Sequence, residues 1–127
     1  ACIKYGIRTI AVMPLGIDRI TPYSNRELYH QILKNNGIIL AEDIWVGGYN
    51  KYFYPRRNRI IAGLSMTTIV IEAGVKSGAV TTADLAFNEN RQILAVPGRV
   101  DMEYSKGTND LIRDNKAELL NDLAQIR

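Results

Sequence analysis

The chain has 127 residues, of which 46% are hydrophobic and 23% are charged, and a formal net charge of +3. These values are typical of about one soluble globular domain. The single cysteine, Cys2, excludes an internal disulfide, no Cys/His cluster suits a zinc site, and no apolar run approaches the roughly 18 residues of a membrane span. We therefore expect a cytoplasmic protein that spans no membrane and holds no metal or cofactor.

Short apolar runs recur along the chain, separated by helical patterns. The expected strands are residues 9–13, 37–41, 68–71 and 92–96, with a weaker run at 117–120. These runs are continuously apolar and rich in isoleucine and valine, which is typical of parallel strands covered on both faces.

Helices are predicted between these runs. Ser24 and Glu27 have the spacing of a capping box, which predicts a helix that ends at Asn36-Gly37. Further helices are expected at 57–64, from Thr81 or Thr82 to Asn90, at 108–113 and at 122–126. The alternation of strands and helices predicts an α/β fold with a mostly parallel sheet.

Ligands of such sheets bind beyond the carboxyl ends of the strands. The loops that follow the four main runs, 14–18, 42–43, 72–78 and 97–99, are therefore expected to share one edge. The loop 73–79 is rich in small residues and precedes a helix, so its backbone N–H groups, with Lys76 and Ser77, suit a phosphate; the alternative is a tight turn only. Arg99, after Pro97 and Gly98, could also contact a phosphate, or the segment could simply end the strand.

A segment of mixed aromatic and basic residues, YNKYFYPRRNR at Tyr49–Arg59, is the main functional signal. No Asp or Glu occurs between Asp43 and Glu72, so the local positive charge comes from one lysine and three arginines. Cations neutralise phosphates and rings stack on unpaired bases, so this pattern favours single-stranded nucleic acid. The alternative is an exposed loop and a helix with solvated arginines.

Catalytic residues are poorly represented in the sequence. His30 has no nearby Ser or Cys partner along the chain, and Asp18, Glu42 and Glu72 at strand ends could form an acid/base pair. The commoner role of such acids is to orient loop arginines or to cap backbone N–H groups. We assign no catalytic residue.

Several motifs, in order along the whole chain, resemble one family. Residues 54–65, YPRRNRIIAGLS, resemble the FPxRNRIIAGLS signature of the DNA-processing protein A family (DprA, also called Smf). The segments 9–18, 21–25, 69–83, 91–98 and 105–112 resemble its TIAVLGxGLD, YPxxN, VVEAxxxSGSLITA, GRxVFAVPG and SxGxNxLI motifs.

This resemblance implies a Rossmann-like domain over 1–127 that binds single-stranded DNA in natural transformation (competence) and DNA recombination. It also implies delivery of that DNA to the RecA recombinase and no catalysed reaction. We expect the chain to form a homodimer. The DNA-binding candidates are those that match the motifs, lie in the loop before the signature, or add charge there: Lys51, Phe53, Arg56, Arg57, Asn58, Arg59, Ser77, Gly78, Pro97, Gly98, Arg99, Ser105, Gly107 and Asn109.

The chain also departs from the family pattern. The upstream GSR-type strand end and a GLARGID segment are absent, so we expect a partial domain that lacks two N-terminal strands. Exposed sheet edges would then favour self-association. Two alternatives remain: a nucleotide-binding enzyme similar to nucleoside-monophosphate phosphoribohydrolases, although the PGGxGT loop is missing, and a module that binds an acidic protein.

Overall fold

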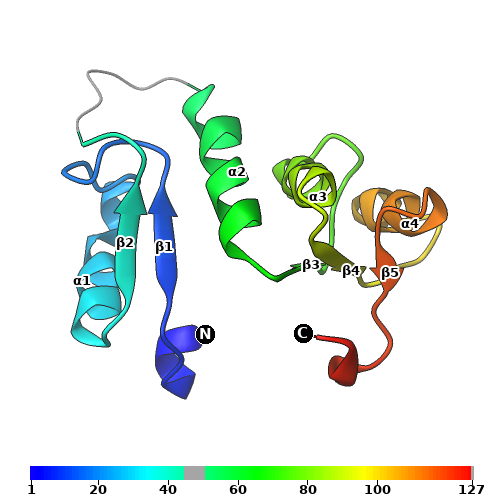
Figure 1. The fold of residues 1–127 in the computed structure, drawn as a ribbon, viewed down its shortest axis with the longest axis horizontal. Coiled ribbons are helices and arrows are strands. Elements are labelled where there is room, and N and C mark those ends of the chain that lie inside the picture. The colour runs from blue at the N-terminus through cyan, green and yellow to red at the C-terminus, as the bar shows by residue number, and fades with distance from the viewer. Residues whose placement is uncertain (45–50, 127) are drawn as a thin grey trace. The chain divides into compact units, whose positions relative to one another are not determined.

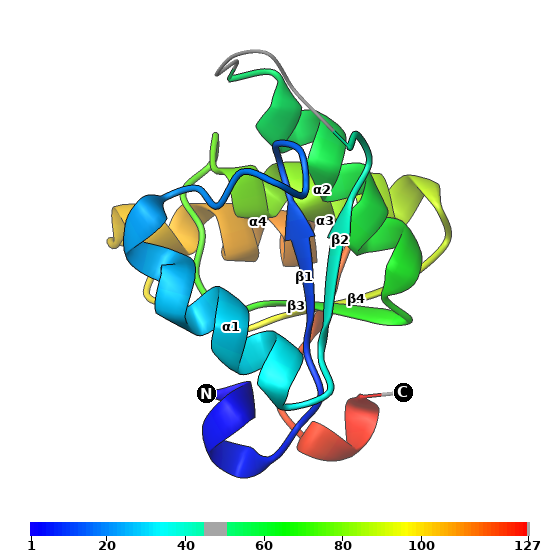
Figure 2. The same ribbon diagram turned by 90° about the vertical axis from the view of Figure 1, so that its left-hand side faces the viewer.

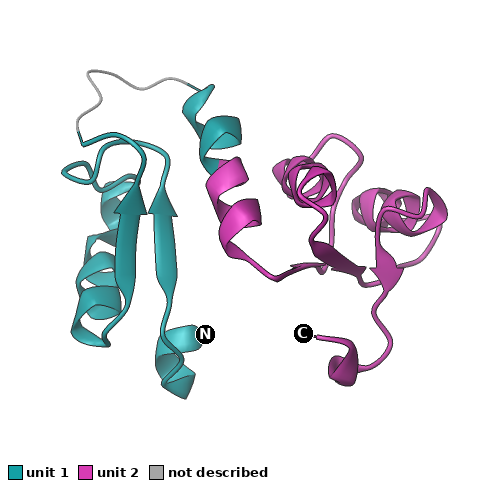
Figure 3. Ribbon diagram, viewed as in Figure 1, with its two compact units in different colours: residues 1–57 teal, residues 58–127 magenta. Residues whose placement is uncertain are grey.

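The computed structural model describes residues 1–44 and 51–126, and the described chain forms two compact units, Ala1–Arg57 and Asn58–Arg127 (Figures 1 and 3). The start of the aromatic and basic segment, Tyr49-Asn50, lies outside the described residues. The expected single domain over 1–127 therefore stays a prediction, and each unit is described by itself.

The first unit contains a two-stranded parallel sheet. It comprises a 3-10 turn at Cys2–Tyr5, β1 at Ile10–Met13, α1 at Arg26–Lys34, β2 at Ile38–Ala41 and the start of α2 at Phe53–Leu64. Ile10 pairs with Ile38 and Met13 with Ala41. The helix α1 covers one face of this sheet (Figure 2), where Ile32 is buried.

The second unit contains a three-stranded parallel sheet in the order β3-β4-β5. It comprises the end of α2, β3 at Thr67–Val70, α3 at Gly78–Asn88, β4 at Gln92–Ala95, α4 at Lys106–Arg113, β5 at Glu118–Leu119 and a 3-10 turn at Leu123–Gln125. The helices α3 and α4 lie over the same face of the sheet (Figure 1). The core of this unit is rich in alanine, which allows the helices to lie close to the sheet. Its buried residues are Ala62, Val70, Ala73, Ala83, Ala86, Ile93, Ala95, Leu111 and Ala117.

All described strand pairs are parallel, so the predicted α/β class with a parallel sheet is confirmed. The predicted helix stop at Asn36 is also confirmed. Three helices are each followed closely by an asparagine in the left-handed region, Asn36, Asn90 and Asn115, with φ of 57°, 53° and 56°. Asparagine adopts this conformation at lower cost than most residues, because its short amide can bond locally.

Three predicted helix starts were wrong. Ser24 lies in a 3-10 turn at Tyr23–Asn25, and α1 has no side-chain cap, so the predicted capping box does not form. The helix α2 begins at Phe53 rather than at residue 57, with Pro55 inside its first turn, where a missing N–H costs nothing. The helix α3 begins at Gly78 because Ser77, rather than a threonine further on, caps it.

Candidate nucleic-acid interface

The carboxyl ends of β1 and β2 meet the first turn of α2 in the first unit. Side chains from all three elements line one small pocket: Met13, Pro14, Glu42, Asp43, Phe53, Arg56 and Arg57. The loops after the first two predicted strands therefore share an edge, as the parallel arrangement required. Phe53 is half-buried in this arrangement.

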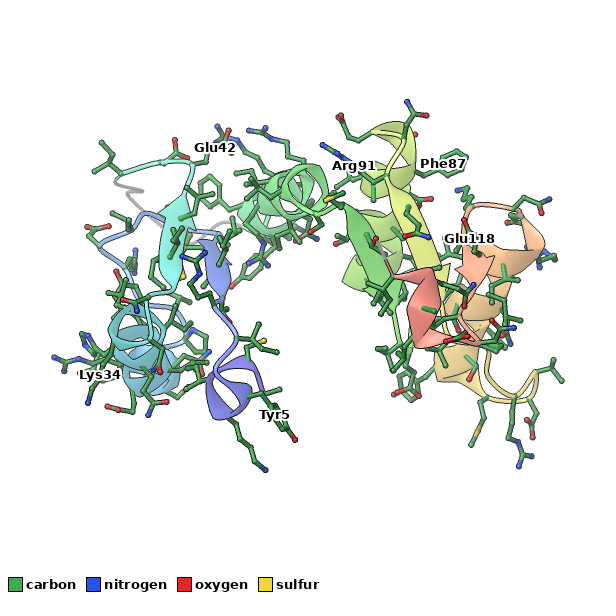
Figure 4. The ribbon with its side chains drawn as sticks, turned by 60° about the horizontal axis from the view of Figure 1, so that its bottom comes forward. Tyr5, Lys34, Glu42, Phe87, Arg91 and Glu118 are labelled. Atoms are coloured by element: carbon green, nitrogen blue, oxygen red, sulfur yellow. The ribbon has the colours of Figure 1, made fainter. Side chains whose placement is uncertain are left out.

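Arg56 is held by two carboxylates from the end of β2. Its Nε lies 3.1 Å from Glu42 Oε2, and its Nη1 donates to Asp43 Oδ2 at 3.2 Å. Of the two roles expected for Glu42, the ion pair with Arg56 corresponds to orienting an arginine, although this arginine lies in α2 rather than in a loop. Figure 4 labels Glu42. The contribution predicted for Arg56 from its charge alone is offset by these two acids.

Arg57 points to the backbone of β1. Its Nη1 donates to the Val12 carbonyl oxygen at 2.6 Å. Burial lowers the pKa of Arg57 below its ordinary value, while the electrostatic effect of Tyr54 acts in the opposite direction. Arg57 therefore joins the start of α2 to β1, which is a structural role beside any contact with a ligand.

Lys51 and Tyr52 form an exposed pair directly before α2. The Lys51 Nζ lies 5.6 Å from the centre of the Tyr52 ring, and the ring is 69% exposed. In the second unit, Arg59 is exposed and Asn58 is half-buried on the continuation of α2. Lys51 and Arg59 are thus cations at the surface, and Tyr52 is a more accessible ring than Phe53.

In the second unit, the loops after β3 and β4 converge on the start of α4. The Ala73 N–H donates to the Tyr104 carbonyl at 2.7 Å, and the Gly107 N–H donates to the Ala73 carbonyl at 2.8 Å. A Cβ on Gly107 would lie 2.6 Å from the Ala73 oxygen. The glycine of the SxGxN motif is therefore required by close backbone approach.

Gly98 and Asn109 form a reciprocal pair. The Gly98 N–H donates to Asn109 Oδ1 at 3.1 Å, and Asn109 Nδ2 donates to the Gly98 carbonyl at 3.0 Å. A Cβ on Gly98 would overlap the Ser105 side chain. Gly98, Ser105, Gly107 and Asn109 thus share one arrangement, which fixes the loop that includes Pro97.

Ser77 is the N-cap of α3. Its Oγ accepts a hydrogen bond from the Val80 N–H at 3.3 Å, which leaves the hydroxyl hydrogen able to donate elsewhere. A Cβ on Gly78 would meet nothing within 4 Å, so the surface is open there. The first N–H groups of an α-helix have no partner within it, and they favour anions.

Arg99 is paired with Asp101 at the surface. Its Nε and Nη2 donate to the two carboxylate oxygens at 3.0 Å and 2.7 Å. This hydrogen bond raises the pKa of Arg99 and lowers the pKa of Asp101. Because the pKa of Asp101 is lowered, the pair is present at neutral pH and is lost as pH falls through that lowered pKa.

Comparison with known proteins decides the family. The family model described as DNA recombination-mediator protein A matches residues 1–127. The chain belongs to this family. The resemblance inferred from the motifs is therefore confirmed, and so is the Rossmann-like fold class.

Two curated members of the DNA recombination-mediator protein A family illustrate the similarity. Protein Smf of Synechocystis sp. is 38% identical over 122 residues, which cover 96% of this chain and 30% of that protein. DNA processing protein DprA of Streptococcus pneumoniae is 37% identical over 114 residues, which cover 90% of this chain and 40% of that protein. The chain thus spans about a third of these relatives' lengths.

Two solved structures have the same fold. The X-ray structure of Streptococcus pneumoniae DprA matches with a TM-score of 0.81 and 34% identity, over 99% of this chain and 45% of that chain. DNA processing protein A from Helicobacter pylori, whose structure concerns a single-stranded DNA binding mode, matches with a TM-score of 0.81 and 29% identity, over 91% of this chain and 53% of that chain.

Two features of this family member were not apparent from the sequence. Asp43 lies next to Glu42 but gave no sign of pairing with Arg56, 13 positions away. Tyr52 was one of several rings in the segment, and only its exposure distinguishes it from Phe53. Among the described residues, no helix is long and apolar enough to cross a membrane, and no group of three or more His, Cys, Asp or Glu side chains could hold a metal ion.

Proposed function

We propose that this chain binds single-stranded DNA as a DNA-processing protein of its family, without catalysing a reaction. The observation that carries the proposal is the exposed Lys51–Tyr52 pair at the start of α2. Phosphates would contact Lys51, and an unpaired base would stack on Tyr52, with a stack contributing about 1–3 kcal/mol.

The second unit supplies further phosphate contacts in this proposal. Arg59 is exposed on α2, and Lys76 is exposed beside Ser77 at the start of α3. Arg99 can exchange Asp101 for a phosphate, because exposed surface ion pairs contribute little to stability.

The alternative, a nucleoside-monophosphate phosphoribohydrolase, has less support. An enzyme of that kind needs a carboxylate at the strand edge that is able to act on the substrate. It also carries a PGGxGT loop, where this chain has Pro97-Gly98-Arg99-Val100, and the Gly98 N–H is bonded to Asn109. We therefore favour a binding protein over an enzyme.

The wider role we propose follows from the family. The chain would act in the cytoplasm during natural transformation and recombination, as a homodimer that delivers single-stranded DNA to the RecA recombinase. Size-exclusion chromatography with light scattering tests the dimer, and a pull-down of RecA after nuclease treatment tests the partner.

Fluorescence anisotropy of a labelled single-stranded oligonucleotide tests DNA binding directly. With about four cations on phosphates, log K should fall with log[salt] at a slope of roughly −3. We expect the single strand to bind more tightly than the duplex of the same sequence. Absence of binding by folded protein at low salt would overturn the proposal.

Ser77 offers a substitution that separates binding from stability. Ser77→Asp keeps an N-cap acceptor, so the free energy of unfolding should change by less than about 0.5 kcal/mol. The new carboxylate would repel a phosphate at the start of α3, and we expect DNA affinity to fall about tenfold. Urea unfolding and anisotropy measure the two effects.

Ser77→Asn is the matched control, because asparagine caps helices equally well and carries no charge. It should bind DNA with nearly the parent affinity. Equal affinities for the Asp and Asn variants would show that no phosphate lies at this position.

A further inference from the structure

The ion pairs of Arg56 are accessible to solvent. The side chains of Arg56, Glu42 and Asp43 are 48%, 27% and 41% exposed. Because pairs of this exposure contribute little to stability, Arg56 can exchange a carboxylate for another anion at small cost. The cluster is therefore a place where a phosphate and two fixed acids compete for one guanidinium.

The charges at this edge oppose a phosphate. Glu42 and Asp43 bring two negative charges to the single positive charge of Arg56. Arg57 adds one positive charge, but its Nη1 is directed at the Val12 carbonyl. Formal charges at the pocket therefore cancel, although the sequence from residue 44 to residue 71 contains no acid at all.

The acids come from a different element than the cations they meet. Glu42 and Asp43 directly follow β2, whereas Arg56 lies in α2, and the parallel pairing of β1 with β2 places the carboxyl end of β2 at this helix start. The fold therefore brings the acids to Arg56 and compensates its charge. Arg56 lies in the aromatic and basic segment for which we propose contact with DNA.

We propose that Glu42 and Asp43 limit the affinity for single-stranded DNA by competing with phosphate for Arg56. This inference rests on the proposed function and adds a control to it. Lys51 and Arg59 contact the DNA phosphates whenever the strand is bound. Arg56 contacts a phosphate only after its ion pairs with Glu42 and Asp43 break. A brake of this kind keeps binding reversible, which suits a protein that must release its strand.

The test compares single-strand affinity and its salt dependence in the parent chain, Glu42→Gln/Asp43→Asn, Arg56→Ala and the triple variant. Amides are similar in shape to the acids and remove only the charge. We expect the double variant to bind about fivefold more tightly, with a salt slope steeper by about 0.7 for one added phosphate contact. This gain should vanish when Arg56 is alanine.

Glu89→Gln/Glu118→Gln is the matched control. It changes net charge by the same amount. Both glutamates are exposed in the second unit and form no ion pair in the described part of the chain. Figure 4 labels Glu118. It should change affinity by less than about twofold, since separated surface charges are screened by salt. Circular dichroism and thermal unfolding establish that each variant is folded, and Glu42→Gln alone replaces the double variant if that one unfolds.

The possible results distinguish failure of the proposed competition at Arg56 from failure of the proposed DNA binding. An equal gain in DNA affinity in the Glu89→Gln/Glu118→Gln control would overturn the proposed competition, and so would a gain that persists when Arg56 is alanine. Either result would mean that the change in net charge, and not the release of Arg56, raises the affinity. Unchanged binding by the double variant would also overturn it. Weaker binding would overturn it and would indicate that the acids position Arg56 for DNA. A parent chain that binds no DNA at any salt concentration would overturn the proposed function and this inference with it.

Discussion

Lys51→Ala/Arg59→Ala is expected to weaken single-stranded DNA binding by roughly 30-fold at moderate salt. Both side chains are exposed, so their loss opens no core, and it would remove the two phosphate contacts that we propose for them. Two lost contacts should also reduce the magnitude of the salt slope by about 1.4. The loss should be similar for oligonucleotides of different sequence, because phosphate contacts carry no sequence information.

Lys34→Ala/Arg113→Ala is the control for that experiment. It removes one lysine and one arginine from other helices, at the end of α1 and at the end of α4 (Figure 4 labels Lys34). Its affinity should stay within about twofold of the parent, because these charges are screened from the DNA by salt. Equal losses in the two double variants would mean that net charge, rather than the α2 region, determines binding.

Arg57 is better tested by stability than by DNA affinity. Arg57 donates a hydrogen bond to the Val12 carbonyl. An Arg57→Ala variant could therefore lose DNA affinity because it is less stable, even if Arg57 makes no contact with DNA. For this reason Lys51 and Arg59, rather than Arg57 and Arg59 of the RNR motif, are the pair chosen to test the DNA site.

Gly107→Ala is expected to lower the free energy of unfolding by about 2–3 kcal/mol, which is an overpacking cost at the high end of the usual range. The new Cβ would lie 2.6 Å from the Ala73 oxygen, 2.8 Å from the Gly74 oxygen and 2.9 Å from Val80. Two of these neighbours are backbone atoms, so the loop after β3 must move away from α4. Urea unfolding followed by circular dichroism measures the change.

Gly63→Ala provides the contrast. A Cβ on Gly63 would meet nothing within 4 Å, and the residue lies in α2. Alanine has the higher helix propensity, so this variant should be stabilised by about 0.5 kcal/mol. If Gly107→Ala were as stable as the parent, the close contact between α4 and the loop after β3 would be contradicted.

Local patterns in the sequence were sufficient to predict the positions of the strands and the end of the first helix. Continuous apolar runs marked the first four strands, a weaker run at 117–120 marked β5, and Asn36 marked the end of α1. These features are readable because they depend on neighbours a few residues apart. The helix starts were less readable, since Ser24, Ser77 and the threonines after it are all chemically able to cap, and only packing selects among them.

The motifs identified the family but did not assign roles to their residues. Gly98, Ser105, Gly107 and Asn109 were all candidates for contact with DNA, and the structure shows that they first serve to hold two loops and a helix together. A short motif indicates that a residue type is needed at a position. It does not show whether that need is structural or comes from DNA binding.

The sequence by itself determined the α/β class, the order of strands and helices, the family and the segment with most positive charge, because each depends on local composition and spacing. Only the tertiary structure decided which groups Arg56 and Arg57 meet. Arg56 meets acids that follow β2, and Arg57 meets a carbonyl 45 positions earlier in the chain. Electrostatic attraction acts through space, so partners of this kind are set by how parallel strands bring distant loops to one edge.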